Sequence, residues 1–396
     1  MATATFARRL GAFVKSAAAN KGSGWFGPHM AAASRAIVER IPLVDFILEI
    51  RDARIPMSSE YEHLRQFPSS LRRIIVLNKM DLADRSKTQE WMRYFQEHNK
   101  ICYGINSHNK DNVKEFLNFL QARVRELKKI DQSSYTTTIM LVGIPNVGKS
   151  ALANSLHQVG RISAAEGKAE AFNSESTARG DERYQQFEGV NPFFFSLCVL
   201  HTRSIEKIGS HPNIYVLDTP GVLPPENLDV EVGAKLALTG AIEDYLVGEC
   251  ELARYFLAIL NLSNEYKHWA NLLGEEDDRS SVDYKANPLG SSELDMRRRK
   301  QYATDHTQDF VVRDVRRTLF EAVSSFEGNL ENDEEVVRLI NAQFLALRDA
   351  FRLPLESGEN LCYRVSIKLL NLYRTGRLGH YTLDSVPRNA QYPTTI

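Results

Sequence analysis

The chain has few cysteines and no long apolar run. Its 396 residues include four cysteines (Cys102, Cys198, Cys250 and Cys362), which are scattered and form no C-x-x-C pair. This spacing excludes a disulfide framework and a cysteine zinc site, and it suits a reducing compartment. The strongest apolar stretch, residues 193–200, is far too short to span a bilayer, so the sequence predicts no transmembrane segment.

An excess of charge is also missing. The chain has 49 basic and 50 acidic residues, for a net charge of −1. Any affinity for nucleic acid must therefore come from local patches. Acidic residues are absent before Glu39, a region that contains five basic residues. Apolar residues in this region fall roughly on one helical face, opposite basic ones: Phe6, Leu10, Phe13 and Val14 against Arg8, Arg9 and Lys15.

An acid-free, basic and amphipathic N-terminus is typical of a mitochondrial or chloroplast transit peptide. We assign that role to residues 1–24, and the alternative is a disordered basic tail. The length of the chain predicts two or three domains.

Short apolar runs alternate with helical patterns through the middle of the chain. Strands are expected at 44–50, 74–77, 101–105, 137–142 and 214–217, with helices at 58–67, 88–97, 113–128 and 150–159. This alternation indicates an α/β fold, a parallel sheet with helices on both faces. Residues 245–396 are instead expected to be mostly helical, with helices at 251–260, 307–323, 334–348 and 363–375.

Residues 143–150, here called the phosphate loop, fit the pattern G-x-x-x-x-G-K-S between an expected strand and an expected helix. The backbone around Asn146, Val147 and Gly148 can turn its N–H groups toward phosphates, and the following helix offers its positive N-terminus. Lys149 should reach the β- and γ-phosphates, while the Ser150 hydroxyl ligates Mg²⁺.

Residues 78–81, N-K-M-D, form a candidate guanine box. The Asp81 carboxylate can accept two hydrogen bonds from guanine that adenine does not offer in that arrangement. Lys79 can cover the ring face, and Asn78 can tie this box to the phosphate loop. A site built from such polar groups rejects a mismatched base by about 10⁴-fold.

Residues 218–221, here called the switch loop, read D-T-P-G. Asp218 is placed to hold the metal through water, and the Gly221 N–H to sense the γ-phosphate. Another polar loop, with Asn106 and Ser107, also follows an expected strand. All four loops thus belong at the carboxyl ends of strands, where ligands bind in open sheets.

The order of these loops is unusual, because the guanine box precedes the phosphate loop. This order, with D-A-R at 52–54 and W-F-G-P-H-M at 25–30, resembles the circularly permuted, YlqF/YawG-type ribosome-biogenesis GTPases, especially the mitochondrial ribosome-associated and plant DAR GTPases. The resemblance covers residues 25–165 and 201–260 well. It implies a P-loop GTPase domain with permuted motif order over 25–244 and a helical, RNA-binding domain over 245–396.

The resemblance also implies roles for particular residues. Asn146 resembles the asparagine that binds K⁺ beside the phosphates, with a polar loop residue as the alternative. Val222 stands where many GTPases have a water-orienting glutamine, so intrinsic hydrolysis should be slow. His29 matches a histidine with a catalytic role. Because the family's P-G is exchanged to G-P just before it, a surface or packing role is the alternative.

Residues 166–200 depart from the resemblance, and we interpret them as an atypical, loosely looped insert. Thr202, sixteen residues before Asp218, is the candidate switch-one threonine that closes on Mg²⁺, with Thr177 as the alternative. The expected catalytic set is then His29, Lys149, Thr202 and Gly221. The expected metal set is Ser150, Thr202 and Asp218.

Basic and aromatic residues gather in the C-terminal third, and such combinations can bind phosphates and stack on bases. A solvated helix face is the alternative. The residues are Arg297, Arg298, Arg299, Lys300, Arg313, Arg316 and Arg317, then Arg364, Lys368, Arg374, Arg377, His380 and Arg388 with Tyr363, Tyr373 and Tyr381.

Taken together, the resemblance implies a GTP- and GDP-binding, Mg²⁺-dependent GTPase that assembles the mitochondrial large ribosomal subunit and binds its rRNA. Low intrinsic activity, stimulation by the ribosome and by K⁺, and a matrix location with peripheral association at the inner membrane are expected, with the chloroplast as the alternative compartment. The alternative functions are a nucleotide-binding scaffold with weak hydrolysis, or an organellar GTPase acting on another RNA or at the inner membrane.

Overall fold

The computed structural model describes residues 2–19, 28–67, 72–130, 136–172, 204–210, 213–223, 229–263, 265–267, 269, 306–354 and 358–387. They divide into two compact units. A helical unit comprises Met1–Ser16, Asp229–Leu238 and Glu243–Gly379, and an α/β unit comprises Ala17–Leu228, Thr239–Ile242 and His380–Ile396. Each unit is made from more than one stretch of the chain, and the expected domain boundaries at 24 and 244 stay predictions.

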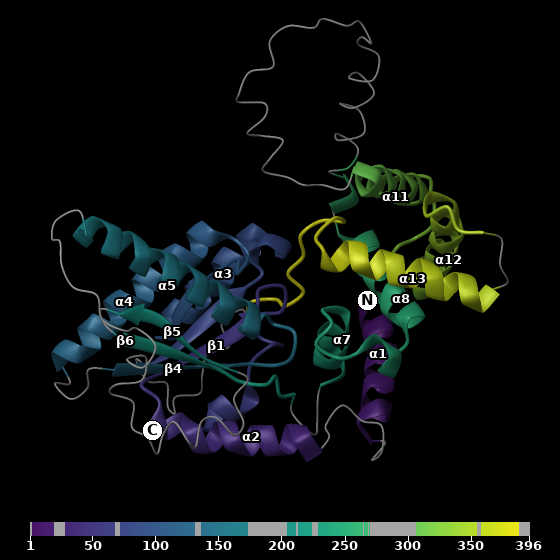
Figure 1. Cartoon of the computed structure of the whole chain (residues 1–396). Coiled ribbons are helices and arrows are strands. Elements are labelled where there is room, and N and C mark those ends of the chain that lie inside the picture. The colour runs from purple at the N-terminus through teal and green to yellow at the C-terminus, as the bar shows by residue number, and fades with distance from the viewer. Residues whose placement is uncertain are drawn as a thin grey trace, which may run out of the picture. The chain divides into compact units, whose positions relative to one another are not determined.

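The α/β unit is built on a six-stranded sheet in the order β3-β2-β1-β4-β6-β5 (Figure 1). All neighbouring strands are parallel except β5 and β6, which are antiparallel with an irregularity between Lys207 and Gly209. The expected parallel sheet is confirmed, and edge strand β5 is an addition to it. The strands are β1 Phe46–Asp52, β2 Arg73–Asn78, β3 Ile101–Gly104, β4 Thr136–Val142, β5 Ser204–Ser210 and β6 Asn213–Asp218.

Helices cover both faces of this sheet. In the strand register Glu49 lies beside both Ile75 and Val142. Ile75 belongs to the apolar cluster of α3 (Arg85–Glu97), and Val142 to that of α2 (Pro28–Arg40), so both helices pack on the same face. Helices α4 (Lys110–Ile130) and α5 (Lys149–Phe172) pack together, and Figure 1 shows α2 and α5 on opposite sides of the sheet.

Two expected elements differ in extent. The helix expected at 58–67 is reduced to a 3-10 turn over Glu62–Gln66. Glu60 instead pairs with Arg51 of β1 at 2.9 Å, and such tertiary contacts override weak helix propensity. Helix α5 runs to Phe172, so the first residues of the expected insert continue the helix. The rest of the insert, 173–200, lies outside the described residues.

Neighbouring strands β1 and β4 mark the point where the chain changes direction across the sheet. After β1 the chain proceeds to β2 and β3, whereas after β4 it proceeds to β5 and β6 on the other side. Ligands bind at such a switch point, outside the carboxyl ends of the strands. The D-A-R loop (residues 52–58) follows β1 and the phosphate loop follows β4, so both stand at this position.

The helical unit has a core of apolar side chains that also contains a buried pair of amide side chains. Asn261 and Gln343, both buried, exchange amide hydrogen bonds of 3.0 and 2.7 Å between α8 and α12. No helix in the described ranges is long and apolar enough to cross a membrane. The helices include α1 Ala2–Ala19, α7 Val230–Leu238, α8 Glu249–Leu262, α11 His306–Ser324, α12 Asp333–Ala350 and α13 Gly358–Arg374.

Helix α1 forms part of this unit. Its Phe6, Leu10 and Val14 side chains are buried, and the Thr5 hydroxyl donates to Asp333 of α12 at 2.6 Å. A side chain at Gly11 would collide with the backbone of Val230 in α7. The amphipathic pattern that predicts a transit peptide therefore also serves here to bury one face of α1 in a folded unit.

Candidate guanine-nucleotide site

The phosphate loop has the curled backbone that directs N–H groups inward. Asn146 and Gly148 have φ angles of 60° and 94°, in the left-handed region. A Cβ at Gly148 would collide with the Asn78 side-chain amide, so only glycine allows this approach. Successive residues of this kind form a concave anion site.

Lys149 and Ser150 lie where the phosphate loop enters α5. The buried Lys149 ammonium donates to the carbonyls of Gly143 (3.1 Å) and Ile144 (2.7 Å), which both belong to the phosphate loop. The Ser150 hydroxyl donates to Asp218 Oδ2 at 2.6 Å.

The oxygen atoms around Asp218 fit a magnesium ion. Asp218 Oδ1 is buried and has no hydrogen-bond partner among the described residues. A serine hydroxyl beside a carboxylate with a spare oxygen is a donor set that Mg²⁺ accepts. Gly221 of the switch loop is so close to Pro145 that an added Cβ would lie 2.5 Å from its Cα, so the switch and phosphate loops are in contact.

Asn78 connects three loops. Its side-chain amide donates to the Val147 carbonyl of the phosphate loop at 2.8 Å, as expected from the sequence. Its Oδ1 accepts from the backbone N–H (3.2 Å) and hydroxyl (2.7 Å) of Ser107. The Ser107 carbonyl in turn accepts from Ser155 of α5 at 2.8 Å. The polar loop after β3 is thus fixed against both the guanine box and α5.

The guanine box itself is held by Lys79. This residue has a left-handed φ of 63°, and its ammonium donates to the Asn146 carbonyl at 2.5 Å and to Asp52 Oδ2 at 3.0 Å. Asp81 is exposed in the following 3-10 turn, so its carboxylate is accessible. Asn106 Oδ1 accepts from the N–H of His108 at 2.9 Å, which shapes its own loop.

Two expected participants, His29 and Thr202, have no described contact with the site. His29 is exposed at the start of α2, and no hydrogen bond or ion pair joins it to the phosphate loop in the described ranges. Thr202 and its alternative Thr177 lie outside the described residues. Their catalytic and metal roles stay predictions. Val222 is buried in the apolar cluster under α2, where it has no means of orienting water.

The D-A-R triplet makes contacts that sequence reasoning missed. Asp52 is buried and accepts from the Arg54 backbone N–H (3.0 Å), Nε (3.0 Å) and Nη2 (2.8 Å). Burial alone raises the pKa of the Asp52 carboxyl, but the charges of Arg54 and Lys79 outweigh it and hold that pKa well below its usual range. The signal available in the sequence was an acid–base pair directly at the end of a buried strand.

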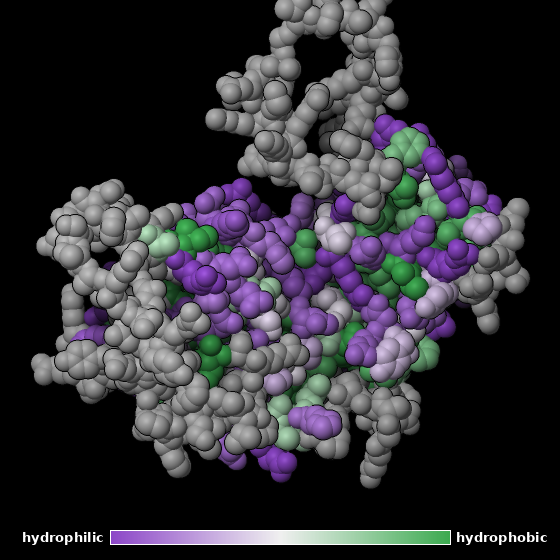
Figure 2. Space-filling model, in the orientation of Figure 1, coloured by the Kyte–Doolittle hydropathy of each residue, from purple (hydrophilic) through white to green (hydrophobic). Residues whose placement is uncertain are grey.

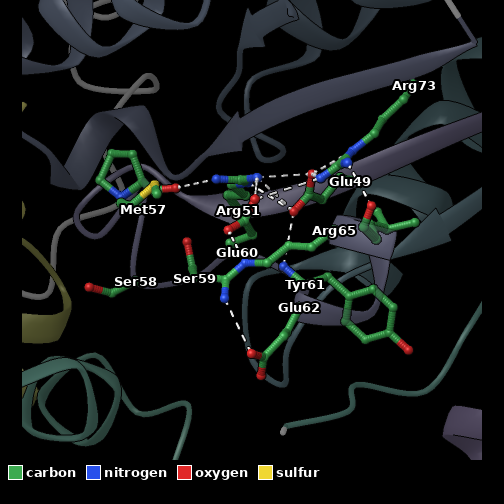
Figure 3. Close-up of polar contacts among 12 residues, drawn as sticks. Glu49, Arg51, Met57, Ser58, Ser59, Glu60, Tyr61, Glu62, Arg65 and Arg73 are labelled. Carbon is green, nitrogen blue, oxygen red and sulfur yellow. Dashed lines mark hydrogen bonds and ion pairs between the residues drawn. The ribbon is translucent and has the colours of Figure 1, made fainter. Parts of the chain in front are cut away.

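A second group of charges, here called the Glu49 network, is drawn in Figure 3. It lies on the face of the sheet covered by α3, because the Arg51 guanidinium is 5.3 Å from the ring centre of Phe95 in that helix. Arg51 pairs with Glu49 and Glu60, each at 2.9 Å, and Arg73 pairs with Glu49 at 2.7 Å. Because Glu49 and Arg51 are two residues apart on β1, they share a face, and Asp52 points to the other. The Glu49 network therefore holds the segment at 60–65 rather than the guanine box.

The chain returns to the α/β unit after residue 379 and crosses the D-A-R loop. The Asp384 carboxylate accepts from the backbone N–H groups of Met57 and Ser58, each at 2.8 Å, and from the Ser58 hydroxyl at 2.7 Å. The Leu383 N–H donates to the Arg54 carbonyl at 2.7 Å. These hydrogen bonds fix the D-A-R loop against residues 383–384.

The expected RNA-binding surface is only partly accessible. Arg374 is engaged inside the helical unit, because it pairs with Asp244 at 2.6 Å and donates to the last carbonyls of α7. Arg316 donates to the Arg377 carbonyl, and Tyr373 is buried. Buried Tyr381 belongs to the α/β unit. We therefore remove these four residues from the expected RNA-binding surface, because their side chains stabilise the fold.

Other members of that surface remain accessible. Tyr363 is exposed, and the guanidinium of exposed Arg313 lies 5.0 Å from the ring centre of exposed Phe310. Figure 2 shows hydrophilic side chains mixed with apolar ones over α11 and α13. Residues 297–300 and Arg388 lie outside the described residues.

Comparisons with known proteins agree with this geometry. Residues 138–277 match the family described as 50S ribosome-binding GTPase. The chain is 55% identical over 400 residues to DAR GTPase 2, mitochondrial, of Arabidopsis thaliana, covering 100% of both chains. It is 38% identical to Short integuments 2, mitochondrial, of the same plant (92% of this chain, 89% of the relative). It is 28% identical to Ribosome biogenesis GTPase A of Bacillus cereus (79% and 98%).

The guanine box, the phosphate loop and the switch loop are in contact, and they follow one another along the chain in permuted order. The chain is also similar to a DAR GTPase over its full length. The chain therefore belongs to the circularly permuted, YlqF-type GTPases of ribosome biogenesis, within their DAR GTPase branch.

Proposed function

We propose that the protein is a Mg²⁺-dependent GTP hydrolase whose nucleotide state times its binding to, and release from, the maturing mitochondrial large ribosomal subunit. The proposal rests on hydrogen bonds that join the phosphate loop to the two other loops. Asn78 of the guanine box donates to Val147 at 2.8 Å, and Ser150 donates to Asp218 of the switch loop at 2.6 Å. The relatives include mitochondrial proteins and a ribosome biogenesis GTPase, and this supports the proposed compartment and ribosomal partner.

Each loop has a separate task in binding GTP. The accessible Asp81 carboxylate reads the guanine edge, and the phosphate loop with Lys149 holds the phosphates. Ser150 and Asp218 hold Mg²⁺, which when bound neutralises phosphate charge. Gly221, packed against Pro145, reports the γ-phosphate to the switch loop.

Intrinsic hydrolysis is slow in this proposal. Val222 follows Gly221, is buried, and offers no donor or acceptor to an attacking water. An outside group must then orient the water, and the ribosomal subunit is the candidate activator. Val222 also favours the alternative of a nucleotide-binding scaffold with weak hydrolysis.

A potassium ion beside the phosphates fits the Asn146 side chain. Its Nδ2 donates to the Gly240 carbonyl at 2.6 Å, which leaves the side-chain oxygen for a cation. The accessible basic and aromatic residues of the helical unit are the proposed rRNA contacts. We place the protein in the matrix, with peripheral rather than integral association at the inner membrane.

The test is phosphate release from GTP with and without mitochondrial large subunits, in K⁺ or in Na⁺. Stimulation by subunits and by K⁺, abolished in Ser150→Ala, supports the proposal. Tight guanine-nucleotide binding without stimulated release supports the scaffold. Co-sedimentation of the protein, loaded with a non-hydrolysable GTP analogue, with subunit precursors tests the partner, and recovery of other RNAs alone contradicts it.

A further inference from the structure

The D-A-R loop lies directly beside the guanine box. Asp52 and Asn78 are register partners at the ends of β1 and β2, and the Ala53 N–H donates to the Asn78 carbonyl at 2.8 Å. The side of Asp52 that faces the guanine box is occupied by the Lys79 ammonium, 3.0 Å away. A buried carboxylate thus stands within contact distance of a residue of the nucleotide site.

The Lys79 ammonium is held from two sides. One N–H donates to Asp52 and another to the carbonyl of Asn146 in the phosphate loop. A lysine side chain is long and flexible, and ordering it costs up to about 2 kcal/mol of rotamer entropy. Two acceptors that fix its end in advance remove that cost from nucleotide binding.

Arg54 keeps Asp52 in place for this contact. Its backbone N–H and two guanidinium nitrogens all donate to Asp52, and its Nη2 also lies 3.3 Å from the Thr239 carbonyl. Arg54 is itself buried, and its carbonyl accepts from Leu383. The carboxylate therefore has no freedom to turn away from Lys79.

We propose that Asp52 and Arg54 are positioning residues for guanine-nucleotide binding, because together they hold the Lys79 ammonium against the phosphate loop. The D-A-R triplet then acts on the nucleotide through Lys79 and touches no nucleotide itself. The inference rests on the proposed function, since it assigns a task within the same site.

The Glu49 network supplies a matched control. Glu60 has a mostly buried carboxylate that pairs at 2.9 Å with Arg51, a residue of β1 like Asp52. Arg51 points to the α3 face of the sheet, and Glu60 has no described contact with Lys79. Glu60→Gln removes a comparable charge from the same part of the sheet. Any loss of nucleotide binding that follows from general loosening of β1 will appear in this variant too.

The experiment measures binding and dissociation of N-methylanthraniloyl-GDP for wild type, Asp52→Asn, Lys79→Met, the double variant and Glu60→Gln, with melting temperatures of the nucleotide-free proteins. We expect Asp52→Asn to weaken binding about tenfold or more through faster dissociation, as loss of one charge-assisted hydrogen bond does. The double variant should bind no more weakly than Lys79→Met, because the two residues act as one unit. Glu60→Gln should bind as wild type.

Binding of Asp52→Asn within twofold of wild type, multiplying losses in the double variant, or an equal loss in Glu60→Gln would each overturn the inference. If Asp52→Asn fails to fold, Asp52→Glu replaces it, since it keeps the charge and the Arg54 pairing while displacing the carboxylate. A folded Asp52→Glu must bind more weakly than wild type, and unchanged binding overturns the inference. If the wild-type protein itself shows no preference for guanine nucleotides, the proposed function is wrong.

Discussion

Single buried carboxylates on and beside β1 carry much of the electrostatic character of the α/β unit. Burial alone raises the pKa of the Glu49 carboxyl, but the charges of Arg51 and Arg73 outweigh it and lower that pKa. The pKa of Glu60 is lowered in the same way, mainly by Arg51 against its own burial. With Asp52, three carboxylates are therefore more acidic in the folded chain than in the unfolded chain.

The free energy of unfolding should therefore decrease at acidic pH. A carboxyl with a lowered folded pKa contributes fully above its unfolded pKa of about 4, and loses that contribution as the pH falls toward the folded value. We expect a flat urea midpoint from pH 7 to about pH 5 and a steep fall below about pH 4. The fall should be shallower in Glu60→Gln, and a midpoint that stays level to pH 3 would contradict the assignment.

Asp81 should decide which base is bound. Asp81→Asn replaces an acceptor with a donor, so GTP affinity should fall by at least about tenfold while xanthosine triphosphate gains. Competition against N-methylanthraniloyl-GDP measures both. Asp84→Asn is the control, because the Asp84 carboxylate is engaged in capping α3 through the N–H groups of Ser86 and Lys87. Unchanged preference in Asp81→Asn argues against its role.

At the scale of elements, the loops that carry backbone chemistry could be predicted, and side-chain networks could not. The phosphate loop and the guanine box depend on local glycine and polar spacing, so their place at strand ends followed from the sequence. Strand β5 was missed because its apolar residues Ile205 and Ile208 are separated by two charged residues, which breaks the period of two that marks a strand. Arg374 looked like an RNA ligand because nothing in its own segment reveals Asp244, 130 residues away.

Helix α1 gives a prediction of its own. Leu10 is 1% exposed, whereas Phe13 on the same helix is 44% exposed. Leu10→Ala should lower the free energy of unfolding of the helical unit by about 2–5 kcal/mol, through lost transfer energy and a cavity. Phe13→Ala should cost much less. Thermal or urea unfolding of the whole chain measures both, and equal effects would mean that α1 is not seated as described.

At the scale of the whole molecule, the chain path ties the phosphate loop to a segment between stretches of the helical unit. Residues Thr239–Ile242 belong to the α/β unit, while the chain on either side of them belongs to the helical unit. Asn146 donates to the Gly240 carbonyl at 2.6 Å, and Arg54 to the Thr239 carbonyl at 3.3 Å. Two nucleotide-site neighbours, Asn146 and Arg54, therefore hold this four-residue segment.

Nucleotide binding should consequently alter hydrogen exchange in this segment. If a cation binds the Asn146 oxygen, the side chain is fixed in its present orientation, so the hydrogen bond from its Nδ2 to the Gly240 carbonyl opens less often. We expect exchange at residues 239–242 to differ between nucleotide-free protein and protein loaded with a non-hydrolysable GTP analogue in K⁺, and to differ less in Na⁺. Asn146→Ala should abolish the K⁺ dependence. Peptides from α12, remote from these hydrogen bonds in sequence, serve as the internal reference. Identical exchange at 239–242 in every state would show that the segment is merely a fixed connection, because a carbonyl whose donor depends on the nucleotide cannot keep its neighbours equally protected throughout.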